Sequence, residues 1–205
     1  LFNNKQIKGN FMSKQKFNYT FTINLNGQLL MGVPQEIYNQ LITKVVADII
    51  KSRWRPDRIL VIGTGGFYCG IPIAKILNVP YGVILARHYN ENSSTIVDSI
   101  TTKVDFSKFI AAFDDYMKKC RRLLVIDDLD DSGDTFHELY LLIRKRYGQK
   151  MEIRSAALWH KTSSKHTVDF MGDLIEPDAK TKKMPWIIQP HEQLIEDVRK
   201  KFNLK

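Results

Sequence analysis

The chain has 205 residues, of which 43% are apolar, and a formal net charge of +9 at pH 7. These values predict one domain with a sizeable core, and no apolar run is long enough to span a membrane. The basic charge suits nucleic acid or a strongly anionic small molecule. Because no interleaved aromatic and basic motif is present, we expect no nucleic-acid partner and no membrane association.

The two cysteines, Cys69 and Cys120, lack metal-ligand spacing. They fit isolated thiols in a reducing compartment, so we predict a cytoplasmic protein. The polar, basic start of the chain has no apolar block, which is not typical of a signal peptide. We interpret residues 1–31 as an N-terminal extension that is partly a cap or an expression remnant ahead of Met12.

Helix and strand patterns alternate in the first half of the chain. Apolar residues recur at helical spacing behind Pro34 and predict an amphipathic helix that ends near Arg53. The apolar run from Arg58 to Gly63 predicts a buried strand. The elements predicted next are a turn over 63–66, a helix over 68–77 and a strand over 81–86.

Residues 87–108 differ, because they are polar and rich in Ser, Thr and Asn. Long segments of this kind in compact domains are usually lids or disordered, and we expect a lid here. The later elements are a helix over 109–119, a strand over 123–126, a helix over 135–147, a strand over 153–159, apolar segments over 168–175 and 186–190, and a closing helix from Glu192.

This alternation predicts an α/β fold with a central parallel sheet flanked by helices. The two ends of the chain lie outside the alternation, and we expect them to pack together as a small hood. The main domain is therefore predicted over 32–205, with the hood and C-terminal helix over 168–205.

The most informative stretch runs from Leu123 to Phe136. An apolar strand leads into two adjacent carboxylates, and a short Gly-containing turn then opens onto a helix. Backbone N–H groups and the helix dipole favour an anion at such a turn, and carboxylates favour a cation, which predicts a phosphate and magnesium site. The alternative is an ordinary turn whose polar residues only cap the helix.

The same stretch resembles the diphosphate-sugar signature of the type I phosphoribosyltransferases. The resemblance implies their fold and the transfer of a ribose-phosphate unit from phosphoribosyl diphosphate to a nitrogen base. The matching positions are Asp127, Asp128, Asp131, Ser132, Gly133 and Thr135.

The resemblance also implies roles within the signature. Asp127 and Asp128 face the ribose hydroxyls, directly or through water bound to Mg²⁺, which prefers oxygen ligands and keeps several waters. Asp131 matches the acid near the base N7 and acts as a general base or steadies the N–H. The 5-phosphate is expected on the turn formed by Ser132, Gly133, Asp134 and Thr135.

Two positions depart from the family pattern. Asp134 places an acid beside the phosphate turn, so we expect its carboxylate to point into solvent from the first helical turn. Thr64 stands where relatives commonly carry Arg or Lys in the diphosphate loop, which here includes Gly65 and Gly66. We expect Arg87, or a lid residue such as Lys103, to supply the missing cation. By itself, Gly-x-Gly-Gly is equally an ordinary turn.

A second resemblance, to bacterial xanthine–guanine phosphoribosyltransferases and archaeal relatives, implies the base site. Lys161 matches a lysine that meets the purine 6-oxo group, and Trp186 matches an indole that covers the ring. Ile187 and Glu192 belong to the same base-binding segment, in which Ile188 replaces an acid. The alternatives are a core aromatic for Trp186 and a solvated loop lysine for Lys161.

The sequence therefore predicts a magnesium-dependent phosphoribosyltransferase of purine salvage that uses xanthine, guanine or hypoxanthine. The family resemblance implies a homo-oligomer, either a dimer or a tetramer. One alternative is an enzyme acting on another base, and a second is a regulatory protein of this fold that binds phosphoribosyl diphosphate or nucleotides without catalysis. A receiver domain is excluded because its acids lie early in the chain and on separate strands.

Overall fold

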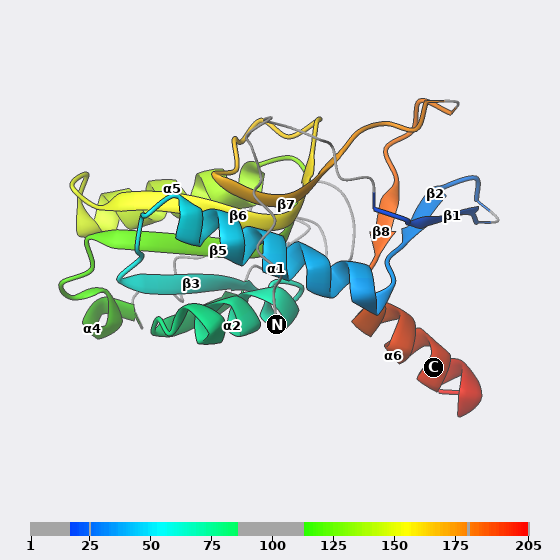
Figure 1. The fold of residues 1–205 in the computed structure, drawn as a ribbon, viewed down its shortest axis with the longest axis horizontal. Coiled ribbons are helices and arrows are strands. Elements are labelled where there is room, and N and C mark those ends of the chain that lie inside the picture. The colour runs from blue at the N-terminus through cyan, green and yellow to red at the C-terminus, as the bar shows by residue number, and fades with distance from the viewer. Residues whose placement is uncertain (1–16, 25, 86–112, 180, 205) are drawn as a thin grey trace, which may run out of the picture.

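A five-stranded sheet forms the centre of the molecule (Figure 1). The structure is a computed structural model and describes residues 17–24, 26–85, 113–179 and 181–204. All neighbouring strands in this sheet are parallel, which confirms the predicted α/β fold. Their order is β4 (Tyr81–Leu85), β3 (Arg58–Gly63), β5 (Arg122–Asp130), β6 (Glu152–Lys161) and β7 (Phe170–Ile175).

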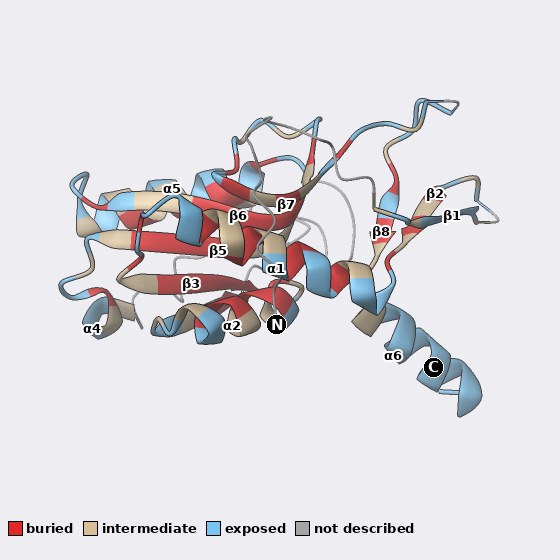
Figure 2. Cartoon of the chain, in the orientation of Figure 1, coloured by how far each residue is buried: buried red, intermediate tan, exposed pale blue. Residues whose placement is uncertain are grey.

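Helices cover both faces of the sheet, and each face has its own apolar core (Figure 2). Successive side chains of a strand point to opposite faces. On β3, Ile59 and Val61 therefore join one core, whereas Leu60 and Ile62 join the other. The first core includes α1 (Gln35–Lys51) and α2 (Phe67–Leu77), and the second includes α4 (Asp114–Met117) and α5 (Asp134–Tyr147).

The central strand β5 is longer than predicted. Its apolar residues from Leu123 to Ile126 are fully buried, as expected for a strand covered on both faces. The strand does not end there, because its ladder with β6 continues through Asp127 opposite Ala157 and Asp130 opposite His160. The acids were expected at the end of a strand that closes at Ile126, and the structure instead keeps Asp127 and Asp130 within the paired strand.

The two ends of the chain form the predicted hood. A second sheet has the order β1 (Thr20–Ile23), β2 (Leu29–Gly32), β8 (Trp186–Ile188), and α6 (Pro190–Lys201) follows it. Figure 1 shows this sheet beside one end of the main sheet. The predicted start of the hood at residue 168 is wrong, because β7 pairs with β6 and its Phe170 is buried in the main core.

Two further predictions differ or fall outside the described residues. Of the helix predicted over 109–119, the described residues contain only α4, which ends at Met117 because Lys118 leaves the helical conformation. The predicted lid over 87–108, with Arg87 and Lys103, lies outside the described residues. Within the described part of the chain, no helix is both long enough and apolar enough to cross a membrane.

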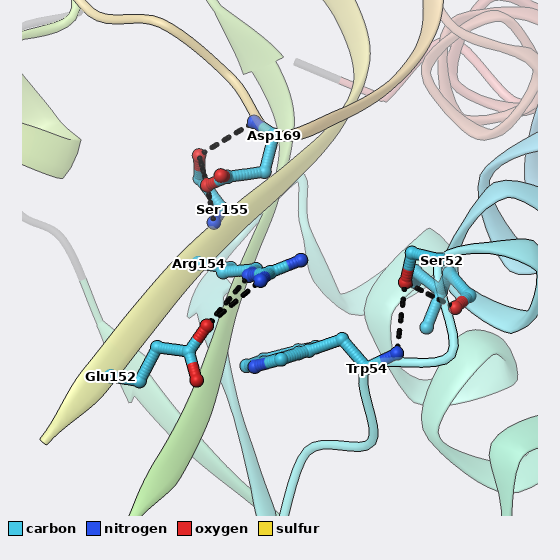
Figure 3. Close-up of polar contacts among 7 residues, drawn as sticks. Ser52, Trp54, Glu152, Arg154, Ser155 and Asp169 are labelled. Carbon is cyan, nitrogen blue, oxygen red and sulfur yellow. Dashed lines mark hydrogen bonds and ion pairs between the residues drawn. The ribbon is translucent and has the colours of Figure 1, made fainter.

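A cluster at the amino end of β6 connects this strand to the end of α1 (Figure 3). The Arg154 guanidinium lies over the Trp54 ring, 4.8 Å from its centroid, and pairs with Glu152 at 2.8 Å. Nearby, the backbone N–H of Ser155 donates to Asp169 over 2.8 Å and holds the β6–β7 connection. These contacts leave the opposite, carboxyl end of the sheet available for a site.

Candidate functional site

Three motifs that are distant in the sequence meet at the carboxyl end of the main sheet. The Gly-rich turn follows β3, the acidic motif ends β5, and Lys161 ends β6. Because these strands are parallel neighbours, their carboxyl ends lie at one edge, where open α/β sheets bind ligands.

The acid pair lies half-buried near the end of β5. The backbone N–H of Asp128 donates to the Asp127 Oδ1 over 2.9 Å. Burial, and then the negative charge of Asp128, raise the pKa of Asp127 well above its usual range. Two carboxylates held this closely in a partly buried position are a favourable place for a cation.

The Gly-rich turn packs against this acid pair. A Cβ atom on Gly65 would lie 2.3 Å from Oδ1 of Asp128, and one on Gly66 would lie 2.2 Å from the carbonyl oxygen of Ile62. Neither position has room for a side chain. Thr64, between the strand and these glycines, is exposed, so its side chain faces away from the core.

The predicted phosphate turn leads into the N-terminus of α5. Gly133 is the N-cap residue, has φ +88°, and offers no side chain to the first-turn N–H groups, which favours an anion there. Asp134 is exposed in the first turn, as expected. The Ser132 hydroxyl donates to Asp134 Oδ2 over 2.9 Å, so it must turn away from Asp134 to reach a phosphate. Thr135 is half-buried.

The β6–β7 loop supports this turn from behind. The backbone N–H of Lys165 donates to the Ser132 carbonyl over 3.0 Å. A Cβ on Gly133 would lie 2.6 Å from the backbone nitrogen of His166 and 2.9 Å from the Ser164 hydroxyl. Glycine is therefore required at this position both by the backbone conformation and by the lack of space.

Lys161 and Asp131 form an ion pair at the mouth of the site. The Lys161 ammonium lies 2.9 Å from Asp131 Oδ1, and the Lys161 side chain is only 6% exposed. Lys161 is therefore not a solvated loop lysine. Asp131 remains half-exposed, at 55%, so the pair has one buried and one accessible partner.

A second pair, one residue earlier on each strand, was missed by the sequence analysis. Asp130 is 2% exposed, and its carboxylate lies 2.7 Å from Nδ1 of His160. The β5–β6 register places these residues opposite each other. An acid inside an apolar strand with a histidine on the next strand was the available signal, but it required knowing the register.

The hood reaches this edge through Gln189, and it carries Trp186 and Ile187 on the preceding strand β8. Trp186 is 51% exposed, which excludes a core aromatic, whereas Ile187 is buried. Glu192 accepts the Gln189 backbone N–H over 2.9 Å and caps α6, so the structure gives this residue a role in the helix start. The Gln189 side chain, also missed as a site residue, is buried and donates to the Asp128 carboxylate.

The oxygen ligands of this site suit Mg²⁺ better than a metal ion held by three or four protein side chains. No group of three or more His, Cys, Asp or Glu side chains with metal-binding geometry occurs within the described residues. Asp127 and Asp128 supply carboxylate oxygens, and Mg²⁺ usually needs only one or two carboxylates besides water and substrate phosphates.

The comparisons identify the family. A model described as "Phosphoribosyl transferase domain" matches residues 34–190, well over half of the chain. The chain therefore belongs to the phosphoribosyl transferase domain family, which confirms the resemblance of the acidic motif. No curated protein matches the chain.

Solved structures show the same fold at low identity. The purine phosphoribosyltransferase of Pyrococcus horikoshii is 23% identical, with a TM-score of 0.54, and the match covers 78% of this chain and 91% of that one. The xanthine-guanine-hypoxanthine phosphoribosyltransferase of Helicobacter pylori is 19% identical, with a TM-score of 0.57 and coverages of 82% and 96%. A hypothetical protein from Neisseria gonorrhoeae with bound ppGpp is 18% identical, with a TM-score of 0.60 and coverages of 81% and 90%.

Proposed function

We propose that the protein transfers the 5-phosphoribosyl group from phosphoribosyl diphosphate to a 6-oxopurine base in purine salvage. The base is xanthine, guanine or hypoxanthine, and the products are the nucleoside monophosphate and diphosphate. The observation that carries the proposal is the buried Lys161 ammonium paired with Asp131, beside the acid pair and the phosphate turn. The Pyrococcus and Helicobacter neighbours act on purines by name, which agrees with this substrate class.

Phosphoribosyl diphosphate would lie along the edge of the sheet. Its 5-phosphate would occupy the N-terminus of α5, where the N-cap Gly133 has no side chain to cap the helix and the Asp134 N–H is bonded only to the Ser132 hydroxyl, over 3.3 Å. Its diphosphate would lie on the Gly65–Gly66 turn, which has no side chains to obstruct a close approach. The ribose hydroxyls would then face Asp127 and Asp128, between these two turns.

Mg²⁺ fits this arrangement through Asp127 and Asp128, directly or through water. When bound, it would neutralise charge on the leaving diphosphate. The two carboxylates, for their part, would orient the ribose and stabilise the positive charge that develops on it when the bond to diphosphate breaks.

The base would lie between Lys161 and Trp186. N7 and O6 are neighbouring acceptors on one edge of a 6-oxopurine, and an ammonium is a donor only, so Lys161 suits O6. Asp131, which pairs with this ammonium, would then face the N7 side of the base and take or steady a proton there. The exposed Trp186 indole offers a stacking surface for the ring.

The test is to incubate the full chain with phosphoribosyl diphosphate, Mg²⁺ and one of xanthine, guanine, hypoxanthine or adenine, and to follow nucleotide formation. We expect turnover with 6-oxopurines. Changing Asp127 and Asp128 together to Asn should abolish most turnover and leave the circular dichroism spectrum unchanged, because both side chains are only half-buried. Undiminished turnover in this double variant rules out the proposed role of the acids.

A regulatory protein is the second candidate. It is favoured by Thr64, which supplies no cation to the diphosphate turn, and by the Neisseria protein solved with ppGpp. Calorimetry distinguishes the two functions. Tight binding of phosphoribosyl diphosphate or a guanine nucleotide, without product from any purine, supports the regulatory role.

A further inference from the structure

The Gln189 side chain connects the hood to the acid pair at the end of β5. Gln189 is only 5% exposed, and its amide nitrogen donates a hydrogen bond to Oδ2 of Asp128. A carboxylate can only accept, so the amide has to present its nitrogen to Asp128. Burial of an amide is costly unless the group is hydrogen-bonded. The contact with Asp128 therefore helps to offset the burial of this side chain.

The backbone around Gln189 is held in place by the hood. The Gln189 N–H donates to Oε2 of Glu192 over 2.9 Å at the start of α6. The carbonyl of Ile188, one residue earlier, accepts the N–H of Val33 over 3.0 Å, which ties this segment to the residue after β2. Gln189 thus reaches Asp128 from an anchored backbone, so the position of the amide donor is defined.

The Asp128 carboxylate is held between Gln189 and the Gly-rich turn. Its Oδ2 accepts the amide, and its Oδ1 lies 2.3 Å from the position that a Cβ on Gly65 would occupy. An ionised carboxylate has about four acceptor sites, so one amide bond leaves sites for ribose hydroxyls or for water bound to Mg²⁺. Gln189 therefore restricts the rotation of this carboxylate without using all of its oxygen acceptor sites.

The donor to Asp128 is neutral, which distinguishes this acid from its neighbours. Asp130 pairs with His160, and Asp131 pairs with Lys161. Among the described residues, no Lys, Arg or His forms a salt bridge with Asp128. An amide orients a carboxylate and leaves its negative charge uncompensated. That charge is what Mg²⁺, or a positive charge developing on the ribose, requires.

We propose that Gln189 is a positioning residue, which acts through Asp128 and holds its carboxylate toward the ribose of phosphoribosyl diphosphate. This role rests on the proposed function for the identity of the ligand, but it concerns binding and does not require turnover. Loss of the amide donor should weaken the binding of phosphoribosyl diphosphate more than that of the base, because the carboxylate could then rotate away from the ribose.

Calorimetry of the full chain with phosphoribosyl diphosphate and Mg²⁺ tests this role. Gln189→Met keeps the length of the side chain and removes the donor, and it should raise the Kd by about ten-fold or more, as is typical when such a supporting partner is lost. In turnover, the KM for phosphoribosyl diphosphate should rise with little change in the KM for the purine. The matched control is Tyr19→Phe, which removes a different attachment of the hood, the hydrogen bond to Asp173 of β7, and should leave the Kd close to the wild-type value.

A double-mutant cycle tests whether Gln189 acts through Asp128. Denaturant unfolding without ligand is measured for Gln189→Met, Asp128→Ala and the two changes together. The loss of stability caused by Gln189→Met should disappear in the Asp128→Ala background, because the amide then has no carboxylate to lose. Circular dichroism checks that each variant is folded, and Gln189→Leu, which also lacks the donor, is used if the Met variant unfolds.

Four results would overturn the proposal. They are wild-type affinity in the variant without the donor, an equal weakening in Tyr19→Phe, additive losses of stability in the cycle, and a wild type that does not bind phosphoribosyl diphosphate. Binding by the wild type without nucleotide formation from any purine would instead contradict the proposed function alone, and the Kd values of the variants would still decide the role of Gln189.

Discussion

Asp128 is the residue at which separate parts of the site meet. Its carboxylate lies against Gly65 of the turn after β3 and accepts a hydrogen bond from Gln189 of the hood. The same residue contributes to the raised pKa of Asp127. A change at Asp128 therefore affects the Gly-rich turn, the hood and the neighbouring acid together.

Base choice should depend on Lys161. Lys161→Met removes the donor to the 6-oxo group and should narrow the gap between 6-oxopurines and adenine, which a site built on such a bond can widen to ~10⁴-fold. Trp186→Ala should weaken the binding of all purines by a similar factor, because stacking does not distinguish one purine from another. Steady-state kinetics with hypoxanthine, guanine and adenine measures both effects.

Ile188 replaces an acid near C2 of the base, so xanthine should not be used much more efficiently than hypoxanthine. Equal wild-type use of adenine contradicts the assignment.

Asp127→Asn should stabilise the ligand-free protein at neutral pH. The folded-state pKa of Asp127 is raised, so this carboxyl favours folding below its unfolded pKa, and that contribution is lost as pH rises through the folded pKa. Asn carries no charge and removes this loss of stability, which amounts to roughly 1.4 kcal/mol for each unit by which the pKa is raised. Thermal unfolding from acidic to neutral pH should show a gain that disappears at acidic pH. Lower stability of the variant at neutral pH would contradict the expectation.

The site residues that the sequence analysis found belong to local motifs, whereas those it missed are defined by contacts between distant segments. Asp131 and Lys161 were each identified by resemblance of one short local motif to the family, and the structure brings their charged groups to 2.9 Å. Asp130 with His160, and Gln189 with Asp128, depend on strand register and on how the hood lies over the sheet. Such contacts between distant segments are not encoded in local spacing.

At the level of elements, the turns after β3 and β5 are fixed by lack of space. Gly65 adjoins the acid pair, and Gly133 adjoins the β6–β7 loop. The sequence predicted these turns and most helices and strands, because local propensity and periodicity are strong there. The sequence analysis ended β5 too early. The strand continues through its acids because it pairs with β6, and no local sequence pattern indicates that pairing.

The turn after β3 should bind diphosphate more tightly if a cation is added. Thr64 is exposed, so Thr64→Lys should place an ammonium in solvent beside the proposed diphosphate without disturbing the core. We expect a gain of up to ~1 kcal/mol in the binding of phosphoribosyl diphosphate, which should shrink as salt is added. Calorimetry at two ionic strengths measures this. Thr64→Gln is the neutral control of similar length, and an equal gain in that variant would argue against a charge effect.

At the level of the whole molecule, the N-terminal segment fastens the hood to the main sheet. The Tyr19 hydroxyl donates to Asp173 over 2.7 Å and accepts from the Trp159 indole over 3.3 Å. These contacts join residues just before β1 to β7 and β6. The hood is thus attached both here and through the contact of Gln189 with Asp128.

Removing this attachment should be costly. Tyr19→Phe leaves the fully buried Trp159 indole N–H without this acceptor, and we expect a loss of about 1–3 kcal/mol in the free energy of unfolding. Denaturant unfolding provides the measurement. Tyr81→Phe, at an exposed position on the edge strand β4, is the control and should change stability by less than about 0.5 kcal/mol. A variant as stable as the control would show that the hood is held elsewhere.

The three tryptophans differ in solvent exposure, so the intrinsic fluorescence of the protein can report on the base site. Trp54 and Trp159 are 7% and 0% exposed, whereas Trp186, in the hood, is 51% exposed. Long-wavelength emission should therefore come mainly from Trp186, and a purine stacked on it should quench that emission. Titration of intrinsic fluorescence can then follow occupancy of the base site without catalysis. Trp186→Phe should abolish the signal and keep the blue-shifted emission of the other two indoles.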